Sequence, residues 1–133
     1  MQRYPQIPNT RAKRQKFLRK ELRQFQGQHY CPALKTYVFV IHGSIKETAI
    51  HAGNTILSTK IALRLPYIIA NAKIDKLHQL PKNNQQRTRF HFAEIGNLIC
   101  GIRGLGTAKL TVGIRIDGKT IQYCVIGFKA YTK

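Results

Sequence analysis

Apolar and polar residues alternate most regularly between residues 109 and 128, in the stretch KLTVGIRIDGKTIQYCVIGF. Asp117 and Gly118 interrupt the alternation, and this dipeptide is typical of a two-residue type I′ turn between antiparallel strands. The stretch therefore predicts a β-hairpin, with strands over residues 107–116 and 119–129.

The predicted turn fixes which residues of the two strands face each other, and it pairs Ile114 with Ile121 and Thr111 with Cys124. Successive side chains point to opposite faces of a strand. One face of the hairpin is therefore predicted to be apolar and to face a core, and the other to be polar. The apolar face carries Leu110, Val112, Ile114, Ile116, Ile121, Tyr123 and Val125, and the polar face carries Lys109, Thr111, Arg115, Thr120 and Gln122.

The N-terminal third shows a helical period instead. Apolar residues recur at steps of three and four from Phe17 to Phe25, which predicts an amphipathic helix that opens at Thr10 and stops at Gly27. Residues 1–9, with two prolines, are predicted to form an irregular arm.

Further along, residues 36–43 read as a strand, and residues 46–52 and 58 onward as helices, the second capped by Ser58. Pro66 lacks a backbone donor and predicts a break in that second helix. Residues 75–88 are polar without a pattern and predict a loop.

Two more strands, over residues 89–95 and 97–103, are predicted before the hairpin, with turns at Gly96-Asn97 and at residues 103–106. Short glycine-containing connections favour an antiparallel meander over crossovers. The predicted fold is α+β: N-terminal helices followed by a four-stranded antiparallel β-meander, with the helices packed on one sheet face. Residues 1–30 are predicted to form a basic arm and helix, and residues 31–133 the main domain.

The net charge of the chain indicates the class of partner that it binds. The chain has 23 Lys and Arg against five Asp and Glu, a net charge of +18, and such an excess indicates a polyanionic partner. We expect nucleic acid, RNA rather than DNA, with an acidic partner or inhibitor protein as a further expectation. No apolar run is long enough to span a membrane and no apolar N-terminal segment resembles a secretion signal, so a cytoplasmic protein without a membrane partner is expected.

The polar face of the first helix is the main candidate for phosphate contacts, although a charged helix face is more often merely solvated. The candidate nucleic-acid-binding residues are Arg11, Lys13, Arg14, Lys16, Arg19, Lys20 and Arg23, together with Lys60 and Lys109.

Metal and cofactor sites are not expected. Cys31, Cys100 and Cys124 are far apart and match no zinc-ligand spacing with the histidines. The five carboxylates are well separated, whereas a metal-dependent nuclease groups carboxylates around its ion. Reduced, mostly buried thiols are the expected state.

Three residues are candidates for catalysis. His51 lies among small residues in ETAIHAGN, and histidine suits proton transfer near neutral pH. Arg115 and Thr111 lie on the polar sheet face, where a guanidinium can stabilise charge on a phosphate. Each candidate has a structural alternative. His51 can be a residue that packs its helix, and Arg115 and Thr111 can belong to a charged outer sheet face that has no catalytic role.

The segment ETAIHAGNTILSTKIALRLPYIIANAKI, followed by LTVGIR and IQYC, resembles small domains encoded by phages and mobile elements. These are similar to the large polyvalent protein-associated domains and to the barnase/colicin/RelE-like nuclease group. The resemblance covers residues 36–128 and implies a metal-independent endoribonuclease in which His51, Thr111 and Arg115 are catalytic. No carboxylate stands where barnase would have an acid–base partner.

The leading hypothesis is therefore a small metal-independent endoribonuclease, a toxin or an effector of a phage or mobile element. His51 would move protons during attack of a 2′-hydroxyl, Arg115 and Lys109 would stabilise the phosphate charge, and Thr111 would position it. The alternative is a non-catalytic nucleic-acid-binding or packaging protein of a phage or mobile element. A third hypothesis is a protein-interaction module whose basic arm docks on an acidic subunit.

Overall fold

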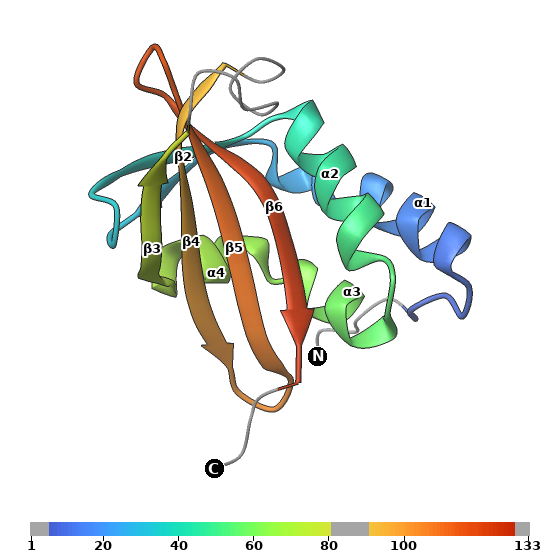
Figure 1. The fold of residues 1–133 in the computed structure, drawn as a ribbon. Coiled ribbons are helices and arrows are strands. Elements are labelled where there is room, and N and C mark those ends of the chain that lie inside the picture. The colour runs from blue at the N-terminus through green and yellow to red at the C-terminus, as the bar shows by residue number, and fades with distance from the viewer. Residues whose placement is uncertain (1–5, 81–90, 130–133) are drawn as a thin grey trace.

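A computed structural model describes residues 6–80 and 91–129, and it shows a curved sheet with helices on one face (Figure 1). The elements in chain order are α1 (Arg11–Glu21), the 3₁₀ turn η1 (Leu22–Phe25), β1 (Gly27–Cys31), β2 (Thr36–Val40), α2 (His42–Ala52), α3 (Ile56–Ala62), α4 (Leu65–Asn71), β3 (Lys73–Gln79), β4 (Phe92–Ile102), β5 (Gly106–Arg115) and β6 (Thr120–Phe128).

The described strands form one six-stranded sheet in the order β1-β2-β6-β5-β4-β3. Neighbouring strands are antiparallel except β2 and β6, which are parallel over the pairs Val38–Thr120 and Phe39–Ile121. The α+β class is therefore right, but the predicted four-stranded antiparallel meander is wrong, because the sheet is mixed and has two further strands.

The missed strands carry little apolar pattern. All seven residues of β3 are exposed, and this segment was predicted as helix end and loop. β3 is held at the sheet edge by main-chain pairing with β4. Such pairing does not require any particular side chains. β1 also lies at an edge and pairs only with β2. The rest of the predicted loop, residues 81–88, and the start of the strand predicted at residue 89 lie outside the described residues.

β4 is one strand where two were predicted. Gly96 and Asn97 do not turn the chain but pair with Val112 and Thr111 of β5. A Cβ at position 96 would overlap the Cδ2 methyl of Leu77, so this glycine leaves room for a side chain of β3 and does not form a turn.

The β5–β6 hairpin differs from the prediction by one residue at its turn. Arg115 N donates to Lys119 O at 2.7 Å and Gly118 N donates to Arg115 O at 2.9 Å, with Gly118 at φ +92. The loop thus has three residues, a common alternative to the two-residue turn. Ile114 consequently faces Thr120 and not Ile121.

An extra residue in β6 then restores the predicted register. The pairing shifts between Thr111 and Val112, so that Val112 faces Gln122 while Thr111 faces Cys124. Between the turn and this bulge, each side chain of β6 therefore projects from the face opposite to the predicted one. Gln122, predicted on the polar face, is fully buried, and its Nε2 donates to Thr48 Oγ1 of α2 at 2.8 Å.

The main core lies between the helices and one face of the sheet. Its fully buried members include Leu18 and Leu22 of α1, Ile61 of α3, Ile68 of α4 and Leu110 of β5. The N-terminal helix therefore shares its core with the rest of the chain, and the predicted boundary after residue 30 falls inside β1.

A smaller apolar cluster lies on the other side of the sheet, at the turn end of β5 and β6. It contains Leu80, Phe92, Ile95 and Ile121, with Phe39 and Tyr123 packed against it. Ile121 and Tyr123 belong to this cluster because of the exchanged faces of β6, and not to the main core as predicted.

Hydroxyl groups of the helices complete the hydrogen bonding of β6 where it has no strand neighbour. Val125 N donates to Thr48 Oγ1 at 3.3 Å, and Gly127 N donates to Ser58 Oγ at 2.8 Å. Ser58 was predicted as a helix cap, but the cap of α3 is Thr55. The predicted break near Pro66 is observed, since α3 ends at Ala62 and α4 starts at Leu65.

The first helix begins as predicted, with Thr10 as its N-cap. Arg14, however, is only 7% exposed, although it was predicted on the solvated polar face. Its guanidinium donates to Gly53 O at 2.8 Å, Asn54 O at 3.1 Å and Pro8 O at 3.3 Å. These contacts hold α1 against the C-terminal end of α2, where a cation is also favoured by the helix dipole.

We expect Arg14→Ala to lower the free energy of unfolding by about 3 kcal/mol, because it removes a charged donor group and leaves buried carbonyls unpaired. Chemical denaturation measures the change. Arg11→Ala, at an exposed position on the same helix, is the control and should change stability by less than about 0.5 kcal/mol. Equal effects of the two substitutions would contradict the structural role of Arg14.

Candidate nucleic-acid interface

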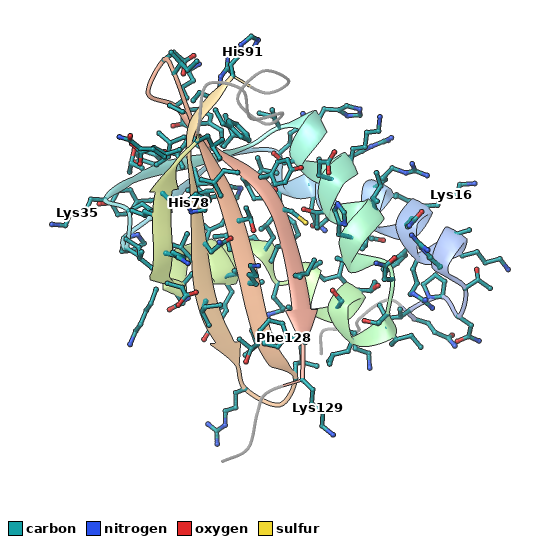
Figure 2. All side chains as sticks on the ribbon, viewed as in Figure 1. Lys16, Lys35, His78, His91, Phe128 and Lys129 are labelled. Atoms are coloured by element: carbon teal, nitrogen blue, oxygen red, sulfur yellow. The ribbon has the colours of Figure 1, made fainter. Side chains whose placement is uncertain are left out.

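A cationic hollow of about 590 Å³ lies along α1 and η1. Its lining consists of Phe17 and five cations, Lys13, Lys16, Arg19, Lys20 and Arg23, and among the described residues no carboxylate contributes to it. Figure 2 shows Lys16 on the outer side of α1, away from the sheet. The buried Leu18 and Leu22 fix the helix against the core and so turn these cations to solvent.

The same cations continue onto α2. A second hollow of about 210 Å³ is lined by Arg19, Arg23, His42, Ile45 and Lys46. His42, predicted at the end of a strand, is instead the first residue of α2. The two hollows adjoin each other, because both are lined by Arg19 and Arg23, and together they are called the helical groove below.

The other predicted cations lie elsewhere. Arg14 is committed to backbone carbonyls and is not available to a phosphate. Arg11 is exposed at the start of α1, and Lys60 is exposed on α3. Neither lines the helical groove.

A second basic surface lies on the sheet face that the helices leave open. Lys109 of β5 and Lys73 of β3 both pair with Ile99, and Lys76 pairs with Asn97. Residues that pair across strands project from the same face. Lys73, Lys76 and Lys109 therefore share one face, the one opposite the helices in Figure 1.

Thr111 lies on this open sheet face, as predicted. Its Oγ1 donates to Asn97 Oδ1 at 3.1 Å, so the hydroxyl is oriented by a neighbouring strand. Arg115 lies at the turn end of the same strand, where its Nη2 is 3.5 Å from Asp117 Oδ2.

His51 lies on α2, which runs along β6 (Figure 1), and its side chain is 52% exposed. It is therefore not sealed in the interface between helix and sheet. Its Nε2 is 3.5 Å from Glu47 Oε2, one turn earlier on the same helix. A carboxylate this close to an imidazole can hold the ring in one orientation.

Glu47 is the residue that sequence reasoning missed. The four-residue spacing to His51 was visible in ETAIH, and it places both side chains on one face of a helix. Glu47 also lines a pocket with Arg115, Gln122 and Tyr123, between the start of α2 and the end of the hairpin.

The three predicted catalytic residues are thus not brought to one point. Arg115 shares a pocket with Glu47, and His51 is joined to that pocket through Glu47 and does not line it. Thr111 does not line it either, but its pairing partner Cys124 lies beside Glu47, with Cys124 Sγ 3.9 Å from Glu47 O.

Within residues 6–80 and 91–129, no three histidine, cysteine or carboxylate side chains are grouped as metal ligands. The cysteines are free and buried. Burial raises the pKa of Cys124 to about 12, with a further contribution from the Glu47 carboxylate, and burial also raises the pKa of Cys100.

The raised pKa of Cys124 predicts a loss of stability in alkali. The folded chain holds the thiol proton more tightly than the unfolded chain, whose thiol pKa is about 9. This contribution is complete below pH 9 and declines as the pH rises towards 12. Denaturation curves across this range should show a steeper decline for the wild type than for Cys124→Ala. Cys31→Ala retains Cys124 and should follow the wild type; identical curves for all three proteins would contradict this account.

None of the helices in the described part of the chain is both long and apolar enough to cross a membrane. No protein-family model matches the chain, and no curated protein or solved structure shows significant similarity to it. The resemblance to the phage-encoded nuclease group therefore stays a prediction, and the function rests on the surfaces described above.

Proposed function

We propose that this protein binds RNA, and that the helical groove holds the phosphate backbone. The observation that carries the proposal is the set of five cations that line one hollow on α1 without a carboxylate among the described lining residues. Phosphate contacts of this kind supply most of the affinity of sequence-independent binding.

The charge of the whole chain supports the same conclusion. At +18, the folded chain carries a self-repulsion that a polyanion would relieve. The open sheet face adds Lys73, Lys76 and Lys109 at a second surface, on the other side of the molecule from α1 (Figure 1).

Salt dependence tests this proposal. The affinity for single-stranded RNA should fall linearly with the logarithm of salt concentration, with a slope of about −0.7 for each phosphate contact. Replacement of Lys16, Arg19 and Arg23 together by Gln should make the slope shallower by about 2. Fluorescence anisotropy at several salt concentrations, with RNA and DNA of one sequence, measures both the slope and the preference.

Lys129→Gln is the control for that experiment, because Lys129 lies beyond the end of β6, far from α1 (Figure 2). It should leave the slope nearly unchanged. Affinity that does not respond to salt, or a triple variant that binds like the wild type, would remove the helical groove from the interface.

A second candidate function is metal-independent cleavage of the bound RNA, and the Glu47–His51 pair favours it. His51 would accept the proton of a 2′-hydroxyl as that oxygen attacks the adjacent phosphorus. The bond from phosphorus to the 5′-oxygen of the next nucleotide would break, and that oxygen would take a proton from solvent water. Glu47 would orient the imidazole, and Arg115 would stabilise the charge on the phosphate oxygens. The products would be a 2′,3′-cyclic phosphate and a free 5′-hydroxyl.

Incubation with mixed RNA in EDTA, between pH 5 and 8, tests this activity. Replacement of His51 by Ala should lower the rate by about 100-fold or more, the usual contribution of a general base. Glu47→Gln should lower the rate less, because Glu47 acts only by orienting His51. His78→Ala, on the exposed edge strand β3, is the matched control. Wild-type protein that leaves RNA intact throughout this range would leave RNA binding as the function.

A further inference from the structure

The open sheet face is arranged as two rows of residues that run across its strands. Residues that pair across neighbouring strands project from the same face of a sheet. The first row joins Lys73, Ile99, Lys109 and Ile126, and the second row joins Lys76, Asn97, Thr111 and Cys124. The two rows therefore present three lysines on one face, and none of their residues is acidic.

The packing of the neighbouring residues shows which way the rows face. Leu98 and Leu110, which lie between the two rows, are fully buried in the main core. A Cβ on Gly127, the neighbour of Ile126, would overlap Ile61 of α3. Because successive side chains of a strand alternate, the rows themselves point away from the helices (Figure 1).

This face also offers an aromatic ring to a base. Phe128 pairs with Thr107 and lies two residues beyond Ile126, so it shares the face of the rows, and it is 37% exposed. A base of any identity can stack on an exposed aromatic ring, and lysines on the same face can contact the phosphates. The combination fits single-stranded RNA, in which phosphates and unstacked bases are both accessible.

The body of the protein separates this face from the helical groove. α1 packs against α2 and α3, and those two helices pack against β6. At roughly 10 Å for each packed layer, the two surfaces lie about 20 Å apart. This separation exceeds the Debye length of about 8 Å at physiological ionic strength, so two bound strands would hardly repel each other.

The two surfaces also draw on different cations. No residue of the two rows lines either hollow of the helical groove. A strand whose phosphates pair with the five cations of the larger hollow leaves a chain of +18 still positive. A second strand is therefore still attracted after the first has bound.

We propose that one molecule of this protein holds two RNA strands at once, one in the helical groove and one on the open sheet face, and so bridges them. The inference rests on the proposed RNA binding and adds a second site to it. A bridge of this kind raises the effective concentration of one strand near the other. It would bring together separate RNA molecules or distant parts of one molecule.

Two uridine decamers, one with a donor dye and one with an acceptor dye, test the bridge. Such decamers do not pair with each other, and 2′-O-methyl groups prevent their cleavage. Energy transfer should rise as wild-type protein is added. It should fall again when protein exceeds RNA, because each strand then binds a separate molecule. Sedimentation equilibrium should give a complex of one chain with two decamers.

Two triple variants assign the strands to the two surfaces. One replaces Lys73, Lys76 and Lys109 by Gln, and the other replaces Lys16, Arg19 and Arg23 by Gln. Each variant should lose the energy transfer but still bind one decamer per chain, which also shows that it folds. The control replaces Lys35, Arg64 and Lys119 by Gln, which removes the same charge from outside both surfaces. It should keep the energy transfer and the two decamers.

One decamer per wild-type chain without energy transfer would overturn the bridge and leave RNA binding intact. Energy transfer from a complex of several chains with one decamer each would also overturn it, because self-association would then join the strands. A sheet-face variant that transfers like the wild type would overturn it and leave that face to an acidic protein. Equal losses in the control and in both variants would overturn it as a general effect of charge. Failure of the wild type to bind any decamer at low salt would overturn both proposals.

Discussion

The structure depends on how the main-chain donors of β6 are satisfied after the strand loses its neighbour. β2 pairs with β6 at only two positions, so the rest of this edge would be buried with unpaired N–H groups. Thr48 of α2 and Ser58 of α3 supply the missing acceptors. An unpaired buried amide costs about as much as a lost hydrogen bond. These two hydroxyls therefore fix both helices against the strand.

The candidate site follows from this junction. Thr48 Oγ1 also accepts a hydrogen bond from Gln122 Nε2, so the residue that completes the hydrogen bonding of β6 orients this buried amide as well. Glu47 precedes Thr48 in sequence and so projects beside β6, and His51 follows one turn later. The candidate catalytic residues Glu47 and His51 therefore lie on the same helix as Thr48, which completes the strand. This follows because α2 packs along the part of β6 that has no neighbouring strand on that side.

The distribution of charge suits this arrangement. The cations of α1 lie outside α2, on the side away from the sheet, while Lys73, Lys76 and Lys109 lie on the open sheet face. Separation over two surfaces lowers the mutual repulsion of a chain at +18. Arg14 shows that position on a basic helix does not decide a residue's role, since the approach of α2 makes it a structural donor.

The sequence by itself determined the α+β class, the basic helix from Thr10, the break before Pro66 and the hairpin over the last third, because these depend on local periodicity and turn chemistry. Only the tertiary structure decided the edge strands β1 and β3, the parallel pairing of β2 with β6, and the exchange of faces in β6. Main-chain pairing leaves no side-chain pattern, and the alternation of residues 109–128 does not mark the extra residue of β6 between Gln122 and Cys124. The pocket of Gln122, Arg115 and Glu47 came from that exchange of faces, so no pattern along the chain could reveal it.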